Sequence, residues 1–331
     1  MTATRTPPAS PAFGSAELRA GDARVVIIPA LGGKIASLQL GGREWLWTSD
    51  VIPRQPPVDG ASYVEMGDSG GYDECFPTIA PCTLPSNIAC FGGLSLPDHG
   101  ELWSQPSTFT LETRPEGMYA ATGWFGRRMP YRFVRAIFVG SDRVEMRYAV
   151  TNDGASPLPF LWSAHPLLPL GKGTRLVLPE AARVRVWSQH GIDLGGTGRE
   201  LRWPRVAVAG KLVDLSHPDA VARAYACKLF VDVPASGGAI AVEEDGARLE
   251  LTLDPAQVPH VGIWLNRGGW SPFRRKGSYR NLALEPCIGA PDSLAEALGA
   301  WRDAAWLAPG ATREWTLVWR GVPAVGTPAT L

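Results

Sequence analysis

Short segments in which apolar and polar residues alternate dominate the sequence, and turn residues separate them about every ten positions. In residues 143–151 every second side chain is apolar, and the four that share a face are Val144, Met146, Tyr148 and Val150. Such alternation is typical of antiparallel sheets that bury one face. The pattern therefore predicts an all-β chain, folded as a large antiparallel β-sandwich.

Hairpins and a meander account for most of the predicted strands. Gly41-Gly42 and Asp245-Gly246 are two-residue turn signals, each flanked by alternating segments. The expected strands are residues 24–28, 34–40, 43–47, 107–113, 118–125, 131–139, 143–151, 239–244 and 247–253. The four at 107–151 are consecutive, so we expect them to pair as a meander.

One short helix and two long loops are predicted between the strands. The helix begins near Asp292, because residues 293–296 match a capping box and apolar residues follow at helical spacing. Residues 53–99 and 265–280 are expected to be long loops, which often carry binding groups. We expect a disordered leader over residues 1–15, one β-sandwich domain over residues 16–322 and a tail over residues 323–331.

Composition narrows the class of partner and the compartment. Lys plus Arg and Asp plus Glu both number 32, so no net charge favours a nucleic acid or an anionic membrane. No segment approaches the ~18 continuous apolar residues of a membrane helix. Five cysteines without a CxxC pair suit a reducing compartment. We expect a cytoplasmic monomer or homodimer that binds a small molecule, and one disulfide among Cys75, Cys82 and Cys90 stays open.

Familiar catalytic motifs are absent or fail on inspection. Residues 67–71, Gly-Asp-Ser-Gly-Gly, match the pentapeptide around the nucleophile of trypsin-like proteases. Those proteases place His before Ser, whereas the first histidine here is His99, downstream of Ser69. A glycine-rich turn explains the motif better. The sequence has no nucleotide-binding motif and only scattered histidines, so neither a metal nor a cofactor is expected.

Three polar residues are conspicuous at strand ends or turns. Alternation over residues 281–285 places Glu285 on a small polar face, opposite Leu282 and Leu284. A carboxylate that deep in an apolar run is paired, solvated or catalytic, since an unpaired buried charge costs several kcal/mol. His165 ends a similar alternating segment just before a proline, and His99 lies in a turn. An ordinary ion pair for Glu285 and a structural role for each histidine are the alternatives.

Taken together, these segments resemble the aldose 1-epimerase (galactose mutarotase-like) superfamily, in the same order and over nearly the whole chain. The motifs are Gly32-Gly33-Lys34-Ile35, Asp98-His99-Gly100, Ala164-His165-Pro166 and Leu284-Glu285-Pro286, followed by Pro291-Asp292. The resemblance implies the family's large β-sandwich, and a cofactor-independent isomerase that interconverts the anomers of an aldose. It implies Glu285 as general base at the C1 hydroxyl, His165 as general acid at the ring oxygen, and His99 as a hydrogen-bonding residue.

Further substrate contacts follow from the resemblance and from neighbouring residues. The expected contacts are Asp73, Glu74, Asp98, Trp103, Trp162, Lys228, Trp264 and Asn266. The family's early arginine is absent from residues 70–77, where Asp73 and Glu74 stand instead. The aspartate of a later Asp-His pair is absent from residues 226–230, where Lys228 lies nearby. These departures leave the sugar undefined.

Two questions stay open at this point. Arg274, Arg275, Lys276 and Arg280 form a basic cluster that either binds a phosphate or carboxylate on the sugar or is a solvated loop. The rival functions are a carbohydrate-binding protein without catalysis and a glycan-cleaving enzyme. The latter lacks a clearly placed second glutamate or tyrosine opposite Glu285.

Overall fold

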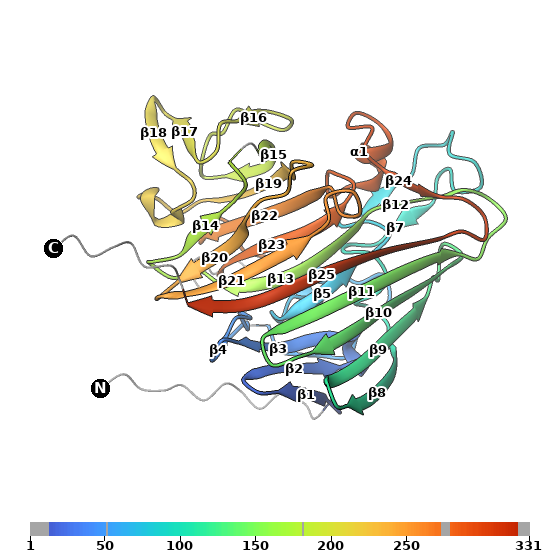
Figure 1. Ribbon diagram of the computed structural model, residues 1–331. Helices are drawn as coiled ribbons and strands as arrows, with labels where there is room; N and C mark the ends of the chain where they lie inside the picture. The colour runs from blue at the N-terminus through green and yellow to red at the C-terminus, as the bar shows by residue number, and fades with distance from the viewer. Residues whose placement is uncertain (1–12, 51, 181, 273–278, 324–331) are drawn as a thin grey trace.

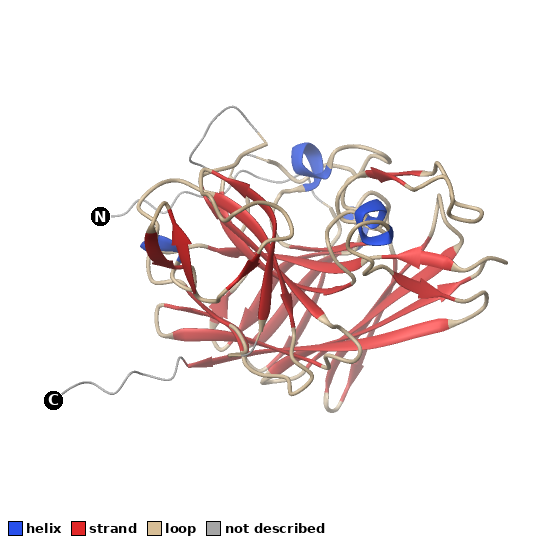
Figure 2. Cartoon of the chain, turned by 90° about the horizontal axis from the view of Figure 1, so that it is seen from above, coloured by secondary structure: helices blue, strands red, loops and turns tan. Residues whose placement is uncertain are grey.

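Two large antiparallel sheets form the body of the molecule (Figure 1). The computed structural model describes residues 13–50, 52–180, 182–272 and 279–323. Strands are the dominant secondary structure, and the helical segments are short (Figure 2). The all-β sandwich prediction is confirmed.

The larger sheet has eleven strands and carries the candidate site. Its strand order is β1 (Ala16–Ala20), β2 (Ala23–Ile28), β3 (Lys34–Leu40), β5 (Tyr72–Cys75), β13 (Trp162–Pro169), β23 (Arg280–Ile288), β22 (His260–Arg267), β19 (Ala226–Asp232), β15 (Arg183–His190) and β16 (Glu200–Leu201), with β4 (Arg43–Glu44) paired to β3. The strands next to one another are antiparallel, so residues far apart in sequence meet at its centre.

The smaller sheet has eight strands and closes the other side of the core. Its order is β14 (Arg175–Val177), β20 (Ile240–Glu244), β21 (Ala247–Leu253), β25 (Thr312–Pro323), β11 (Arg143–Asn152), β10 (Tyr131–Val139), β9 (Gly117–Phe125) and β8 (Thr108–Arg114). Three two-stranded sheets pair β12 (Leu158–Phe160) with β24 (Ala305–Leu307), β17 (Arg205–Val208) with β18 (Lys211–Asp214), and β6 (Cys82–Thr83) with β7 (Ser95–Leu96).

Helical segments occupy only short connections. The α-helix α1 (Leu294–Leu298) begins where the capping box predicts, and the Ser293 hydroxyl accepts a hydrogen bond from the Glu296 amide. It ends at Leu298, so Trp301 lies beyond it. Three further turns are η1 (Pro29–Leu31), η2 (Tyr63–Gly67) and η3 (Pro218–Ala220).

The core lies between the two sheets and is rich in aromatic side chains. Tyr148 of β11 stacks on Trp315 of β25, with ring centroids 5.4 Å apart, and meets Trp162 of β13 at 4.8 Å. The other residues of the predicted apolar face of β11, which include Val144 and Met146, are fully buried. One face of each sheet therefore packs inward, as the alternation predicted.

The predicted hairpins and meander are confirmed, and two boundaries are corrected. Strand β4 covers only Arg43–Glu44 of the expected residues 43–47. The loop expected over residues 53–99 contains β5, a central strand of the larger sheet. Only four residues long, β5 has charged side chains at its middle positions, Asp73 and Glu74, so its burial leaves no apolar alternation to detect.

Several predictions concern the chain ends, the cysteines and membranes. Residues 1–12 of the expected leader and 324–331 of the expected tail lie outside the described residues. All five cysteines carry free thiols, so no disulfide joins Cys75, Cys82 and Cys90. Within the described ranges, no helix has the length and apolarity needed to cross a bilayer.

Candidate functional site

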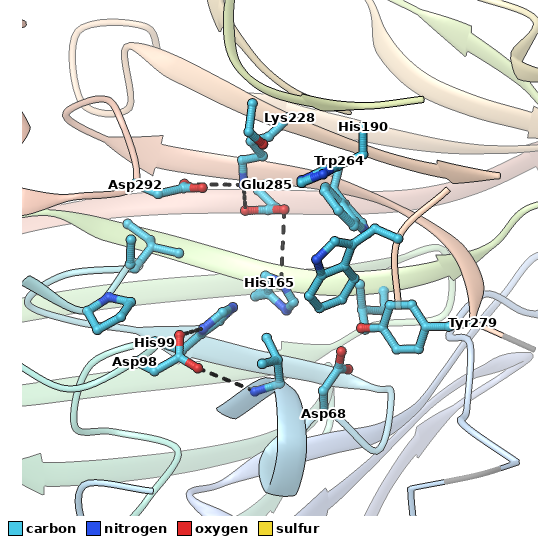
Figure 3. Close-up of a pocket in the computed structure, with 17 residues that line it drawn as sticks. Asp68, Asp98, His99, His165, His190, Lys228, Trp264, Tyr279, Glu285 and Asp292 are labelled. Atoms are coloured by element: carbon cyan, nitrogen blue, oxygen red, sulfur yellow. Dashed lines mark hydrogen bonds and ion pairs between the residues drawn. The ribbon is translucent and has the colours of Figure 1, made fainter. Parts of the chain in front are cut away.

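A pocket of about 230 Å³ opens on the face of the eleven-stranded sheet that is turned away from the core (Figure 3). This volume is many times what a single water molecule needs and suits one small ligand. Alternation creates this face: Leu282 and Leu284 of β23 join the core, whereas Glu285 points to the pocket. His165 of β13 and Lys228 of β19 reach it in the same way.

Glu285 is a deeply buried carboxylate of the pocket, with 1% of its surface exposed. Its Oε2 atom pairs with the ammonium group of Lys228 and accepts a 3.5 Å hydrogen bond from the Ser163 hydroxyl. Its Oε1 atom has no hydrogen-bond partner among the described residues and lies 3.9 Å from Nε2 of His165. One oxygen of Glu285 is thus left for a ligand.

A glycine on the intervening strand lets Lys228 reach Glu285. Gly262 of β22 lies opposite Glu285 in the register. A Cβ at this position would be 3.1 Å from Cε of Lys228 and 3.3 Å from Cβ of Glu285. The missing side chain therefore provides the space in which the ion pair forms. Lys228 Nζ also lies 3.3 Å from the Asp292 carboxylate.

The pKa values of Glu285 and Lys228 are both raised in the folded protein. Burial raises the pKa of Glu285, and the nearby Lys228 ammonium opposes that rise. Burial alone would lower the pKa of Lys228, but the carboxylates of Asp292 and Glu285 outweigh it and raise the pKa. Lys228 therefore stays charged over the physiological range.

A carboxylate and a left-handed turn position His99. Asp98 accepts a 2.9 Å hydrogen bond from the Tyr63 amide at the start of η2, and His99 Nδ1 donates to its other oxygen at 2.8 Å. The His99 ring stacks on Tyr63, with centroids 4.0 Å apart. Gly100 follows at φ +71°, where a Cβ would lie 2.1 Å from the backbone oxygen of Phe76, so only glycine fits this turn.

The two imidazole rings lie edge to face, 5.0 Å apart, and differ in charge. Burial would lower the pKa of His99, but the Asp98 carboxylate outweighs burial and raises it. Burial lowers the pKa of His165 well below its usual value, and the positive charges of His99 and Lys228 add to that effect. His165 is therefore neutral at neutral pH, and His99 is the more readily protonated of the two imidazoles.

Aromatic side chains form one wall of the pocket. Trp264 meets Trp270 at 5.7 Å, and Trp270 meets Tyr279 at 5.6 Å, both edge to face. Trp264 donates its indole hydrogen to Asn281, which fixes the ring. Exposed faces of such rings suit the C–H surface of a sugar.

Of the eleven residues predicted at the site, six line this pocket. They are His99, His165, Glu285, Asp98, Lys228 and Trp264. They come from four strands and one turn between residues 98 and 285, and the sheet brings them together.

Glu74 and Trp162 lie on the core face of the sheet, which corrects the expectation that they contact substrate. Arg135 donates to Glu74 at 3.1 Å, and the Trp162 indole donates to the same carboxylate at 2.9 Å. Alternation explains the placement, because both residues sit one position from residues that face the other way, Asp73 and Ser163.

Three other predicted contacts support the pocket without lining it. Asp73 accepts a 2.7 Å hydrogen bond from the Tyr63 hydroxyl and pairs with Lys34. Trp103 donates to the backbone oxygen of Asp98 at 2.9 Å. Asn266 donates to the backbone oxygen of Trp270 at 2.9 Å and so shapes the turn that carries this ring. We correct their expected role from binding to positioning.

Of the basic cluster, only Arg280 lies within the described residues. Arg274, Arg275 and Lys276 lie outside the described residues. Arg280 donates to Asp219 at 2.8 Å and to the backbone oxygen of Leu170 at 3.1 Å. Its guanidinium group therefore already has hydrogen-bond partners within the protein.

Sequence reasoning missed further residues of the pocket. Asp68, Ser188, His190, Tyr279 and Asp292 all line it. Asp292 belongs to the Pro291-Asp292 motif, which was a usable signal. Within the described ranges, no three His, Cys, Asp or Glu side chains are grouped to hold a metal ion.

Comparisons with known proteins rest on structure alone. No family model and no curated protein matches the sequence. Solved structures with the same architecture include the Slr1438 protein of Synechocystis sp. PCC 6803, with 15% identity, a TM-score of 0.66 and coverage of 98% of this chain and 100% of that one. A galactose mutarotase-like protein from Lactobacillus casei gives 16% identity, a TM-score of 0.60, and coverage of 93% and 100%.

A galactose mutarotase related enzyme from Lactobacillus acidophilus is similar over a comparable length, with 14% identity, a TM-score of 0.58, and coverage of 93% and 97%. At these identities the likeness concerns the fold. Sheet topology and these neighbours agree, and the chain has the fold of the galactose mutarotase-like proteins.

Proposed function

We propose that the chain is a cofactor-independent isomerase of the aldose 1-epimerase type, which interconverts the α and β anomers of an aldose. The observation that carries the proposal is the free Oε1 atom of Glu285, which lies 3.9 Å from Nε2 of His165 in a pocket for one small ligand that His99 also lines. The mutarotase-like fold and the names of its structural neighbours support the same reading.

Anomer exchange needs one base and one acid on opposite sides of the sugar ring. Glu285 takes the proton from the C1 hydroxyl, and the bond between C1 and the ring oxygen breaks as that oxygen receives a proton. Rotation about the C1–C2 bond and reversal of both transfers give the other anomer. Burial raises the pKa of Glu285 and so makes it a better base near neutral pH.

His99 supplies the proton in this proposal. A protonated imidazole carries hydrogen on both nitrogens, and Asp98 occupies Nδ1 of His99, which leaves Nε2–H for the ring oxygen. The sequence-based hypothesis gave the acid role to His165 and the binding role to His99. We exchange these roles because His165 is neutral at pH 7, so it serves as a hydrogen-bonding group beside Glu285.

One observation favours a second candidate, a carbohydrate-binding protein without catalysis. Lys228 pairs with Glu285, and a cation beside a carboxylate weakens it as a base. The same pocket would then hold a sugar without opening its ring. The aromatic wall serves either function.

Saturation-transfer NMR separates the two candidates by measuring anomer exchange directly across a panel of free aldoses. The epimerase proposal expects faster exchange for at least one sugar. It also expects the rate to fall by roughly 10²- to 10⁴-fold in Glu285→Gln and in His99→Asn. Glu314→Gln, which makes the same change at an exposed position of β25, serves as control. Binding of a sugar with no acceleration for any of them would instead assign the chain to the second candidate.

A further inference from the structure

The glycine-rich motif at residues 67–71 places a carboxylate in the pocket. Asp68 lines the pocket although only 1% of its surface is exposed. Its Oδ1 atom has no hydrogen-bond partner in the described part of the chain. Buried polar atoms are nearly always paired, so an unpaired one that faces a cavity indicates a group that a ligand satisfies.

The backbone around Asp68 is fixed, so the carboxylate has a set position. The Asp68 amide donates to the backbone oxygen of Tyr63 at 2.8 Å and ends η2. Gly71 donates to the backbone oxygen of Trp47 at 2.8 Å. Gly70 has φ +80°, and a Cβ there would lie 2.2 Å from that same oxygen, so the motif needs glycine for close approach.

The positive charges near Asp68 pair with other carboxylates. Burial raises its pKa to about 7, although Lys34 and His99 oppose this rise. Lys34 already pairs with Asp73, and His99 already donates to Asp98. Neither group donates to Oδ1 of Asp68, which keeps a free acceptor atom among the described residues.

Asp68 and Glu285 lie on opposite sides of His165 in the pocket, and the Asp68 carboxylate points toward the side where Tyr279 lies (Figure 3). A sugar whose C1 hydroxyl meets Glu285 therefore presents carbons remote from C1 to Asp68. Hydroxyl groups on those carbons are donors that the free oxygen can accept.

The charges of the pocket point to an uncharged ligand. Among the described residues, four carboxylates line it, those of Asp68, Asp98, Glu285 and Asp292, and no arginine does. Each described cation of the pocket already contacts a carboxylate: Lys228 contacts Glu285 and Asp292, and His99 contacts Asp98. A phosphate or carboxylate on the sugar would therefore meet like charge from these residues.

We propose that Asp68 determines specificity by accepting a hydrogen bond from a hydroxyl group remote from C1, and that the substrate is an unphosphorylated, non-acidic aldose. The inference rests on the proposed function and adds the substrate class to it.

Steady-state anomer exchange tests the inference with glucose, galactose, their 3-, 4- and 6-deoxy analogues, glucose 6-phosphate and glucuronate. The wild-type protein is expected to prefer a neutral aldose by about tenfold or more in kcat/KM. One deoxy analogue should lose a charge-assisted hydrogen bond, which raises KM about 10- to 100-fold. In Asp68→Asn and Asp68→Ala the parent sugar's KM rises by a similar factor, and discrimination against that analogue disappears while kcat changes little.

A thermal unfolding scan shows whether the variants remain folded. Oδ1 of Asp68 has no partner among the described residues and burial of the carboxylate raises its pKa, so Asp68→Ala should lower the melting temperature little. Asp22→Asn, an exposed change in the turn between β1 and β2, is the matched control and should leave every parameter as in the wild type.

Two results would overturn the inference: unchanged KM and deoxy-sugar discrimination in both Asp68 variants, or a preference for glucose 6-phosphate or glucuronate. If the wild-type protein accelerates exchange for no sugar, the proposed function fails separately, and calorimetric Kd values decide about Asp68. Binding of a neutral sugar that weakens about tenfold in Asp68→Ala then supports the contact. Absence of binding, or equal binding by both proteins, rejects it.

Discussion

Replacing Lys228 with methionine removes the cation beside Glu285 and keeps a side chain of similar length. Two opposite charges 4 Å apart interact by about 4 kcal/mol at an effective dielectric constant of ~20, which corresponds to a pKa change of about 3. Opposite charges at this range change a carboxyl pKa by about 1 to 3 in measured cases. We therefore expect the pKa of Glu285, already raised by burial, to rise further by about 1 to 3.

The assay is the pH dependence of kcat/KM for anomer exchange, whose acid limb reports ionisation of the base in the free enzyme. In Lys228→Met the limb should move upward by about 1 to 3 on the pH scale. At a fixed pH below the limb, kcat/KM should fall about tenfold for each pH unit by which the limb moves. At pH above the new limb the activity should return, because a stronger base is then ionised.

The stability of Lys228→Met should fall as the pH rises, which is opposite to the pH dependence that a carboxylate in an ordinary salt bridge gives. The folded pKa of Glu285 lies above its usual value of 4.5, and the substitution raises it further. Lys228→Met should therefore unfold as easily at pH 4 as at lower pH, and lose stability as the pH rises from about 4.5 through the new folded pKa. A buried carboxylate without its partner costs about 3 to 5 kcal/mol when fully ionised.

Lys211→Met, an exposed change on β18, is the control for the substitution itself. An acid limb that stays in place in Lys228→Met, with the fold intact, would refute the claim that Lys228 sets the basicity of Glu285.

Three further predictions concern neighbouring features. Asp98→Asn should lower the pKa of His99 and move the alkaline limb of kcat/KM downward by about 1 or more on the pH scale, as a pH profile would record. Arg135→Met removes the cation that pairs with Glu74 in the core, so urea unfolding should give a free energy lower by about 3 to 5 kcal/mol, with KM unchanged. Gly100→Ala forces a Cβ against a backbone oxygen, and both the melting temperature and kcat should fall. An equally stable and active alanine variant would contradict the account of this turn.

Local sequence patterns predicted much of the fold, whereas burial that depends on contacts between distant residues could not be predicted from them. The strands that became β10 and β11 were predicted almost to the residue, because each buries one face and meets its neighbour through a short turn. Strand β5 escaped prediction because its charged residues are satisfied by partners distant in sequence: Arg135 pairs with Glu74, and Lys34 pairs with Asp73.

The candidate site shows the same division. Alternation placed Glu285 and His165 on the pocket face, but the same rule put Trp162 on the core face, and its expected contact with substrate ignored that rule. The Lys228 ion pair depends on Gly262, a residue whose role is visible only once three strands are side by side. Asp68 was hidden in a motif that matched another enzyme class.

The two-faced sheet has a consequence for protein engineering. Every second residue of β13 belongs to the core, whereas Leu167, between them, lines the pocket on the other side of the same backbone. Combinatorial libraries confined to Leu167 and to other pocket residues without a proposed catalytic role should retain soluble expression in a large share of their members, since the interior contacts are untouched. Libraries of equal size at Leu282 and Leu284 should be largely lost to misfolding, which makes the pocket wall the place to search for new sugar preferences.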